Sequence, residues 1–190
     1  MRHQILIASL AAAAIALAAC AEAARDATPA TVPVGNDPFS KIATVLTHPR
    51  CMNCHTVTNF PRQGDDRHPH LFNVTRGPEN KGAAGLHCAT CHTAANQTAS
   101  GLPGAPNWHL APLAMGWEGL SVSQLCKTLV DKTKNGNRGL DALVAHMTED
   151  PLVQWAWTPG AGRKPPSIGQ QEFHQAVKAW AKDGGACPSG

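Results

Sequence analysis

The pattern Cys-x-x-Cys-His occurs twice in this chain, and it limits what the polypeptide can fold around. The copies are CMNCH at residues 51–55 and CATCH at residues 88–92 of a 190-residue sequence. This pattern is the attachment signal for a c-type haem: two thiols bond to one porphyrin, and the adjacent histidine binds its iron. The sequence therefore predicts two covalently attached haem c groups. The residues that would hold them are Cys51, Cys54, His55, Cys88, Cys91 and His92.

Two other uses of paired cysteines compete with this interpretation. The two Cys-x-x-Cys pairs, with 33 residues between them, also have the spacing of a structural zinc site. Zinc, however, does not require a histidine directly after both pairs. A thiol–disulfide redox pair is the other alternative, but nothing around either motif suggests the βαβ unit of a thioredoxin. We therefore favour haem.

The first 20 residues have the features of an export signal. Arg2 precedes an apolar run over residues 5–19, and the run ends in small residues. The run is too short to span a membrane comfortably. We interpret residues 1–20 as a signal peptide and expect an exported, periplasmic protein.

The end of this signal leaves two maturation routes open. The sequence LAAC at residues 17–20 resembles the lipobox of bacterial lipoproteins, in which Cys20 is acylated. Cleavage after Ala23 would instead release a soluble protein. Residues 21–36 are rich in Ala, Thr and Pro and lack apolar periodicity, so we interpret them as a flexible tether. In the lipoprotein case, Cys20 would anchor the protein to the membrane through this tether.

Cys126 and Cys187 remain once the signal and the haem motifs are accounted for. An exported protein folds in an oxidising compartment, where free thiols are uncommon. We therefore predict a disulfide between them, joining the start of a late helix to the tail after the last one. Two separate buried thiols are the alternative.

The charge pattern argues against nucleic acid as a partner. There are 16 Lys and Arg against 13 Asp and Glu, and the lysines are scattered rather than gathered into a basic stripe. There is no Tyr, and only 5% of the residues are aromatic. A core filled partly by two haems is compatible with so few large side chains. Residues 37–188 have the length of one domain.

Helix signals are found at the start of this domain and in its last third. Residues 37–46 begin with Asp-Pro, which is typical of an N-cap and a first helical position. Residues 121–124 form a capping-box pattern, and residues 140–147 carry an apolar stripe with helical spacing. Asp150 precedes a proline that restarts a short segment, and Ser167 is the expected N-cap of the last helix.

The intervening sequence is irregular. Residues 56–87 are rich in Gly, Pro, Asn and charge, and we expect them to wrap the edge of the first haem. No segment shows a convincing strand alternation. The sequence therefore predicts an all-α fold over residues 37–188. It would be a small cytochrome-c-like domain of short helices and long loops wrapped around two covalent haems.

The second axial ligands are predicted from spacing. A haem iron in an electron carrier normally has both axial positions filled, by two His or by His and Met. His70 lies 15 residues after His55, and His109 lies 17 residues after His92. This similar spacing favours His70 at the first iron and His109 at the second. The rivals are His68 at the first iron and Met115, in the loop PLAMGW, at the second.

Arginine and tryptophan side chains are candidates for further haem contacts. A guanidinium suits the bidentate binding of the propionate carboxylates of a haem. Trp108, beside His109, is a candidate for packing against a porphyrin edge. We expect Trp155 and Trp157 to fill the core. The arginines around the first motif are Arg50, Arg62, Arg67 and Arg76.

Five strings carry a family resemblance: HPRCMNCH, QGDDRHPH, GLHCATCH, PGAPNWHLAP and DPLVQWAW. Together they resemble a family of small exported di-haem cytochromes c of Proteobacteria, whose members are sometimes labelled as a subunit of isoquinoline 1-oxidoreductase. The resemblance covers nearly all of residues 37–188. It implies that the two motifs carry the haems and that a periplasmic dehydrogenase supplies the electrons.

We therefore expect a periplasmic di-haem c-type cytochrome. It would relay single electrons between a dehydrogenase or a quinol-oxidising partner and a terminal acceptor, as a carrier or an electron-transfer subunit of an oxidoreductase rather than as an enzyme. The alternative is a small di-haem peroxidase-like oxidoreductase with one open haem site. Such peroxidases are longer and place one haem in each of two domains.

Overall fold

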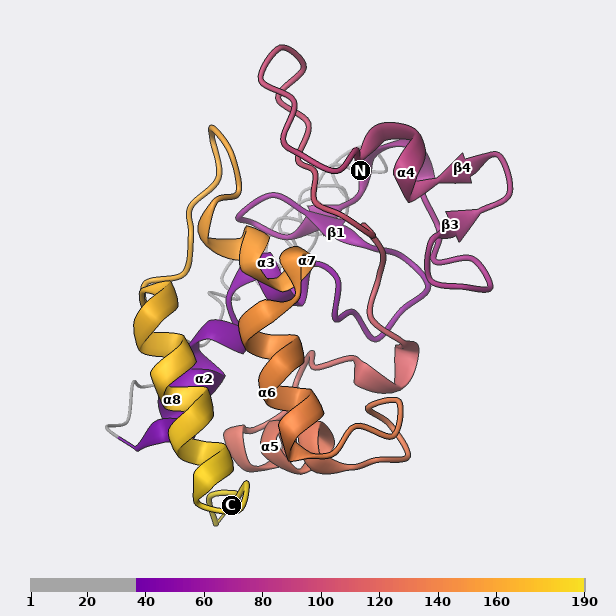
Figure 1. The fold of residues 1–190 in the computed structure, drawn as a ribbon. Helices are drawn as coiled ribbons and strands as arrows, with labels where there is room; N and C mark the ends of the chain where they lie inside the picture. Colours follow the sequence, from indigo (N-terminus) through magenta and orange to yellow (C-terminus); the bar gives the residue numbers. More distant parts are fainter. Residues whose placement is uncertain (1–36, 190) are drawn as a thin grey trace, which may run out of the picture. The chain divides into compact units, whose positions relative to one another are not determined.

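The computed structural model describes residues 37–189. The predicted signal peptide, the tether and Cys20 lie outside the described residues. Within residues 37–189, no helix is long and apolar enough to cross a membrane. The α-helices are α2 Pro38–Leu46, α3 Pro49–Met52, α4 Cys88–Cys91, α5 Val122–Val130, α6 Leu140–Glu149, α7 Pro151–Gln154 and α8 Gln170–Lys182 (Figure 1). Short 3-10 helices cover Leu71–Asn73, Leu113–Met115 and Trp155–Trp157.

Local capping signals determine where several helices begin. Asp37 caps α2, where its carboxylate accepts a hydrogen bond of 3.0 Å from the backbone N–H of Ser40. Ser121 and Gln124 form the reciprocal capping box at the start of α5. Asp150 caps α7 by accepting from the N–H of Leu152. These helix starts are confirmed.

The last helix begins later than the sequence predicts. Its N-cap is Gly169, whereas we expected Ser167. Ile168 is buried in the core, and its carbonyl oxygen accepts a hydrogen bond of 2.9 Å from the indole N–H of Trp157. The Trp157 indole thus occupies a carbonyl that a helix starting after Ser167 would use in its first turn, and residues 167 and 168 form a bend instead.

Two short β-hairpins make the all-α prediction wrong. Strands β1 (Arg62–Gln63) and β2 (His68–Pro69) pair antiparallel, as do β3 (Gly82–Ala83) and β4 (Leu86–His87). The described chain therefore combines helices with two small antiparallel sheets. Strands of two residues are too short to show alternation, and they form because the turns between them are favourable. Gly85, at φ 82°, supplies the left-handed residue in the tighter turn.

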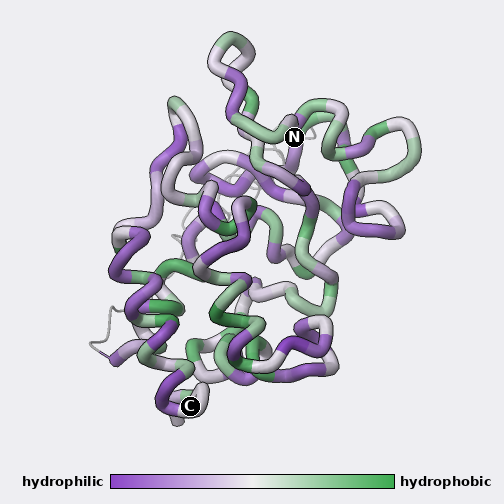
Figure 2. The backbone as a smooth tube through the Cα atoms, in the orientation of Figure 1, coloured by the Kyte–Doolittle hydropathy of each residue, from purple (hydrophilic) through white to green (hydrophobic). Residues whose placement is uncertain are grey.

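The core lies where helices from both ends of the chain meet. Helix α2 packs against α8 and α5, and α6 packs against α8 and α7. Figure 2 shows hydrophobic stretches where these helices meet and hydrophilic ones along α8. Ile42, Leu125 and Phe173 are fully buried there. Each such side chain contributes about 2 kcal/mol through burial. The predicted disulfide between Cys126 and Cys187 is present, and it ties α5 to the tail after α8.

Candidate functional site

The first motif lies on a short helix directly after α2. The ring of His48 accepts a hydrogen bond of 3.2 Å from the N–H of Arg50 and so caps α3. At the other end, the N–H groups of Cys54 and His55 both donate to the carbonyl of Cys51, at 3.1 Å. This tight turn brings Cys51, Cys54 and His55 to one cavity.

The His55 ring is held in one tautomer. Its Nδ1 donates a hydrogen bond of 2.7 Å to the carbonyl oxygen of Met115, and its ring stacks on Trp117 with centroids 3.4 Å apart and planes inclined by 13°. Because a carbonyl only accepts, the proton is on Nδ1 and the lone pair is on Nε2. Burial lowers the pKa of His55 to about 3, so the ring stays neutral at neutral pH.

The second motif repeats this arrangement on other partners. Helix α4 carries both cysteines of this motif, and the N–H of His92 donates to the carbonyl of Cys88 at 2.9 Å. The ring Nδ1 of His92 donates to the carbonyl oxygen of Pro103 at 2.8 Å, and the ring stacks on Trp108 at 4.4 Å and 10°. Burial lowers the pKa of His92 as well. Both motif histidines are therefore neutral rings with a lone pair on Nε2.

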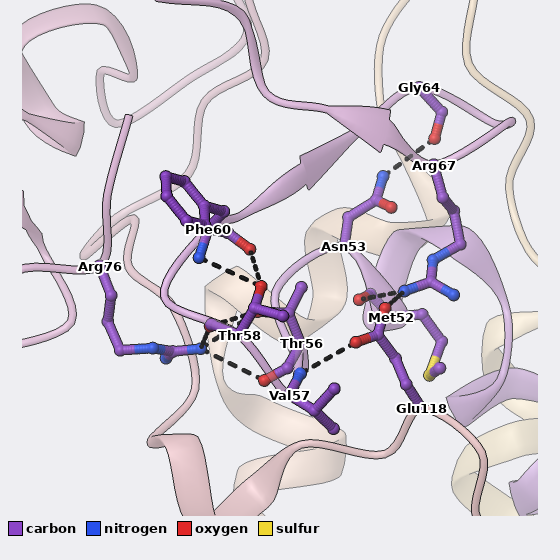
Figure 3. A network of polar contacts seen from close by, with 10 residues as sticks. All are labelled: Met52, Asn53, Thr56, Val57, Thr58, Phe60, Gly64, Arg67, Arg76 and Glu118. Atoms are coloured by element: carbon purple, nitrogen blue, oxygen red, sulfur yellow. Dashed lines mark hydrogen bonds and ion pairs between the residues drawn. The ribbon is translucent and has the colours of Figure 1, made fainter. Parts of the chain in front are cut away.

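A polar network fixes the chain that follows the first motif (Figure 3). The buried guanidinium of Arg76 donates to the carbonyl oxygens of Thr56 and Thr58, at 3.3 and 3.1 Å. Arg67 donates to the carbonyl of Met52 and pairs with Glu118 at 2.5 Å. Glu118 in turn accepts from the N–H of Val57 at 2.9 Å. The network joins the motif to the loop that supplies the Met115 carbonyl and the Trp117 ring.

Each motif lines its own cavity. The first contains Cys51 and His55, and the second contains Cys88, Cys91 and His92. The cavity volumes are about 130 and 360 Å³. The second cavity lies within the usual size range of ligand pockets, whereas the first lies below it. Five residues line both cavities and form a shared wall: Arg50, Cys54, Trp108, His109 and Trp155.

The side chains around the first cavity have the chemistry that a covalently attached haem requires. Cys51 and Cys54 are not joined in a disulfide, and burial raises their pKa values to about 12 and 11, so both are protonated thiols rather than reactive thiolates. Two buried donors that line this cavity, Nε of Arg50 and Nε1 of Trp117, have no hydrogen-bond partner within residues 37–189. A group carrying carboxylates would satisfy them.

The second cavity fits an apolar group. Its thiols Cys88 and Cys91 are also unpaired. Four exposed apolar side chains line it: Leu71, Phe72, Leu86 and Leu102. Exposed apolar side chains gathered around one cavity are typical of a binding site. A porphyrin would cover part of this surface.

The predicted axial ligands do not line the cavities that their spacing in the sequence predicts. His70 lines the second cavity and not the first. His109 lines both, so it is not confined to the second. The sulfur-bearing residue Met115 lines the first cavity and not the second. His68, the rival at the first iron, lines neither and pairs with Asp66 at 2.6 Å.

Some of the predicted arginines and tryptophans line a cavity, and the others belong to the polar network or the core. Arg50 lines both cavities and Arg62 lines the second, whereas the guanidinium groups of Arg67 and Arg76 are engaged in the polar network. Trp108 stacks on His92, with Trp155 at its edge at 4.8 Å. Trp155 is thus a cavity residue, not the core residue we expected. The indole of Trp157 packs on Phe173 at 5.1 Å.

Several functional contacts were missed by sequence reasoning. The Met115 and Pro103 carbonyls that orient the two histidines lie 60 and 11 residues away in sequence. Backbone acceptors leave no residue-type signal, and only the fold brings them to the rings. Trp117 had a weak signal, because it closes the loop PLAMGW.

Comparisons with known proteins do not assign the chain to a family. No family model, curated protein or solved structure matches it. Within residues 37–189, no group of three or more His, Cys, Asp or Glu side chains is arranged to hold a metal ion. A haem iron needs only axial ligands from the protein, so a pair of side chains is sufficient there.

Proposed function

We propose that this protein is a di-haem c-type cytochrome that relays single electrons. One observation carries the proposal. Each motif histidine is a neutral ring that gives its Nδ1 proton to a backbone carbonyl and keeps its Nε2 lone pair, in the cavity lined by its own cysteines. Cys51, Cys54 and His55 would hold one haem c, and the second motif would hold the other.

A bound haem c supplies an iron that accepts and returns one electron. The chain positions the ligands for it. The Met115 and Pro103 carbonyls fix the ring tautomers, and a hydrogen bond to the second ring nitrogen is the usual way to orient a metal-binding histidine. The shared wall supports transfer of an electron between the two haems within one domain, because the same five residues line both cavities.

The proposed partners are redox proteins. A dehydrogenase or a quinol-oxidising protein would supply electrons, and a terminal acceptor would remove them; we assign no substrate reaction to the chain itself. We place the protein in the periplasm, either soluble or tethered through a lipidated Cys20. Fractionation of cells producing the protein and its Cys20→Ala variant distinguishes the two forms, because only the lipidated form stays with the membrane.

Production in a host that matures c-type cytochromes tests the proposal. We expect a mass equal to the processed chain plus two haems, and a c-type reduced-minus-oxidised spectrum. The paired variants Cys51→Ala/Cys54→Ala and Cys88→Ala/Cys91→Ala should each lose one haem. A colourless protein with the mass of the bare chain would refute the proposal. Two low-spin, six-coordinate irons would support a carrier, whereas a high-spin iron that binds added ligands would support the peroxidase-like alternative.

A further inference from the structure

A histidine from the segment after the first motif lies beside the histidine of the second. The ring centroids of His70 and His92 are 6.0 Å apart, and the ring planes are inclined by 76°. His70 lines the cavity of Cys88 and Cys91. We infer that His70 is the second axial ligand of the haem held by the second motif. This inference rests on the proposed function.

The His70 ring has the same hydrogen-bond pattern as the motif histidines. Its Nδ1 donates a hydrogen bond of 2.8 Å to the carbonyl oxygen of Leu71. In this tautomer the proton is on Nδ1 and the lone pair is on Nε2. Within residues 37–189, neither His70 nor His92 forms a hydrogen bond through Nε2. Both rings thus keep the nitrogen that binds iron free.

The distance between the rings matches ligation of one metal. Metal–imidazole bonds are about 2 Å long, so two imidazoles on opposite sides of one ion have centroids about 6 Å apart. The observed 6.0 Å agrees with this value. The 76° inclination and this distance distinguish the pair from the parallel stacks His55–Trp117 and His92–Trp108, at 3.4 and 4.4 Å. An edge-to-face contact has the same spacing, so the free Nε2 atoms and the shared cavity carry the assignment together with the distance.

The backbone around His70 is held at this position. The β1–β2 hairpin ends directly before it, and the N–H of His70 donates to the carbonyl of Pro61 at 3.2 Å. The N–H of Leu71 donates to the side chain of Gln63 at 2.9 Å. Phe72 follows at φ 63°, an unfavourable conformation for a bulky residue. Because Phe72 is 80% exposed, its own packing does not offset this strain.

The assignment makes the two sites interdependent. The segment that leaves the first motif would complete the coordination of the second iron, so the two haems could not belong to independent halves of the chain. His109, which lines both cavities, then remains a candidate for the first iron, as does Met115.

Spectroscopy of the haem-loaded protein tests the assignment. His70→Ala in the two-haem protein should turn half of the haem from low spin to high spin, and free imidazole should restore it. His68→Ala is the matched control, because His68 lies two residues before His70, on strand β2, but lines neither cavity. It should leave both haems low spin. In Cys88→Ala/Cys91→Ala, which retains only the first haem, adding His70→Ala should change nothing.

The outcomes separate this inference from the proposed function. Two low-spin haems in His70→Ala would overturn it, as would a wild-type second haem that is already high spin. A high-spin first haem in the Cys88→Ala/Cys91→Ala background would assign His70 to the other iron. A wild-type protein without haem would instead refute the proposed function. If His70→Ala does not fold, His70→Met should keep both haems low spin and raise one potential, because thioether ligation favours the reduced iron. Unchanged potentials would overturn the inference.

Discussion

At the scale of single residues, a histidine can bind iron through Nε2 only if that nitrogen is not already used in a hydrogen bond. His48 accepts a hydrogen bond through Nδ1, so in the neutral ring its proton lies on Nε2. His174 donates through Nε2 to the side-chain oxygen of Gln154, at 2.7 Å. Neither presents a free Nε2 lone pair, in contrast with His55 and His92. The hydrogen-bond pattern thus argues against His48 and His174 as axial ligands.

Arg76 provides a residue-scale prediction. It is 5% exposed, and its guanidinium donates to the carbonyl oxygens of Thr56, Thr58 and Ala111. Arg76→Met would leave these buried acceptors without a donor, so we expect the free energy of unfolding to fall by about 3 kcal/mol. Urea denaturation measures this. Lys178→Met, an exposed site on α8, is the control and should change stability by less than about 0.5 kcal/mol. A similarly small loss for Arg76→Met would show that the network is dispensable.

At the scale of elements, the start of α2 gives a prediction with a defined pH dependence. Hydrogen bonds from the hydroxyl and N–H groups of Ser40 lower the pKa of the Asp37 carboxyl. Because the folded pKa is the lower one, this contribution is complete above the unfolded pKa, about 3.9, and is lost as pH falls through the folded value. Asp37→Ala should therefore destabilise the protein by about 1 kcal/mol at pH 7. The difference from wild type should shrink in acid.

Stability curves from pH 7 down to pH 3 measure this difference. Asp37→Asn is the matched control, because its amide oxygen can still cap the helix but does not titrate in this range. Its stability relative to Asp37→Ala should not depend on pH. A constant gap between wild type and Asp37→Ala would rule out the carboxylate as the pH-dependent cap.

The disulfide is the second element-scale prediction. It closes a loop with a sequence separation of 61 residues between α5 and the tail after α8. In the chain-entropy account, removing a loop of this length costs roughly 4 kcal/mol. Cys126→Ala/Cys187→Ala should therefore unfold at a clearly lower urea concentration, while retaining both haems. Reduction of the wild-type disulfide should have the same effect, and equal midpoints would contradict the prediction.

Short-range chemistry explains which elements could be predicted. The starts of α2, α5 and α7 depend on a capping side chain within three residues of the helix, so they are visible in the sequence. The two hairpins were missed because each strand has only two residues. The start of α8 was misplaced because a core contact of Ile168, not a local cap, decides it.

In the candidate site, too, features set by neighbouring residues were predicted and features set by distant contacts were not. The cysteines and histidines of each motif were predicted because they lie within five consecutive residues. The carbonyl of Met115 and the ring of Trp117 reach His55 only through the fold. Spacing along the chain placed His70 with the first motif, whereas the β1–β2 hairpin carries it to the second cavity. Similar spacing shows that a histidine is far enough along the chain to contact a haem. It does not show which of the two cavities the histidine lines.

At the scale of the whole molecule, the two sites differ in their surroundings. The first cavity is lined by buried side chains, among them Met115 and Trp117. The second is bordered by exposed side chains, among them Cys91 and Phe72. Arg50 lies on the shared wall, and the buried cation Arg76 lies near the first motif. The environments of the two proposed haem sites are therefore unequal.

This inequality predicts the order of reduction. An oxidised haem carries one more positive charge than a reduced one, so burial and a nearby cation both favour the reduced form. The haem on Cys51 and Cys54 should therefore have the more positive potential. Redox titration of Cys88→Ala/Cys91→Ala, which keeps that haem, should give a higher midpoint than titration of Cys51→Ala/Cys54→Ala. Equal or reversed midpoints would mean that the axial ligands outweigh burial. In the predicted order, electrons enter at the exposed second site and pass through the shared wall to the first, because transfer in that direction is downhill.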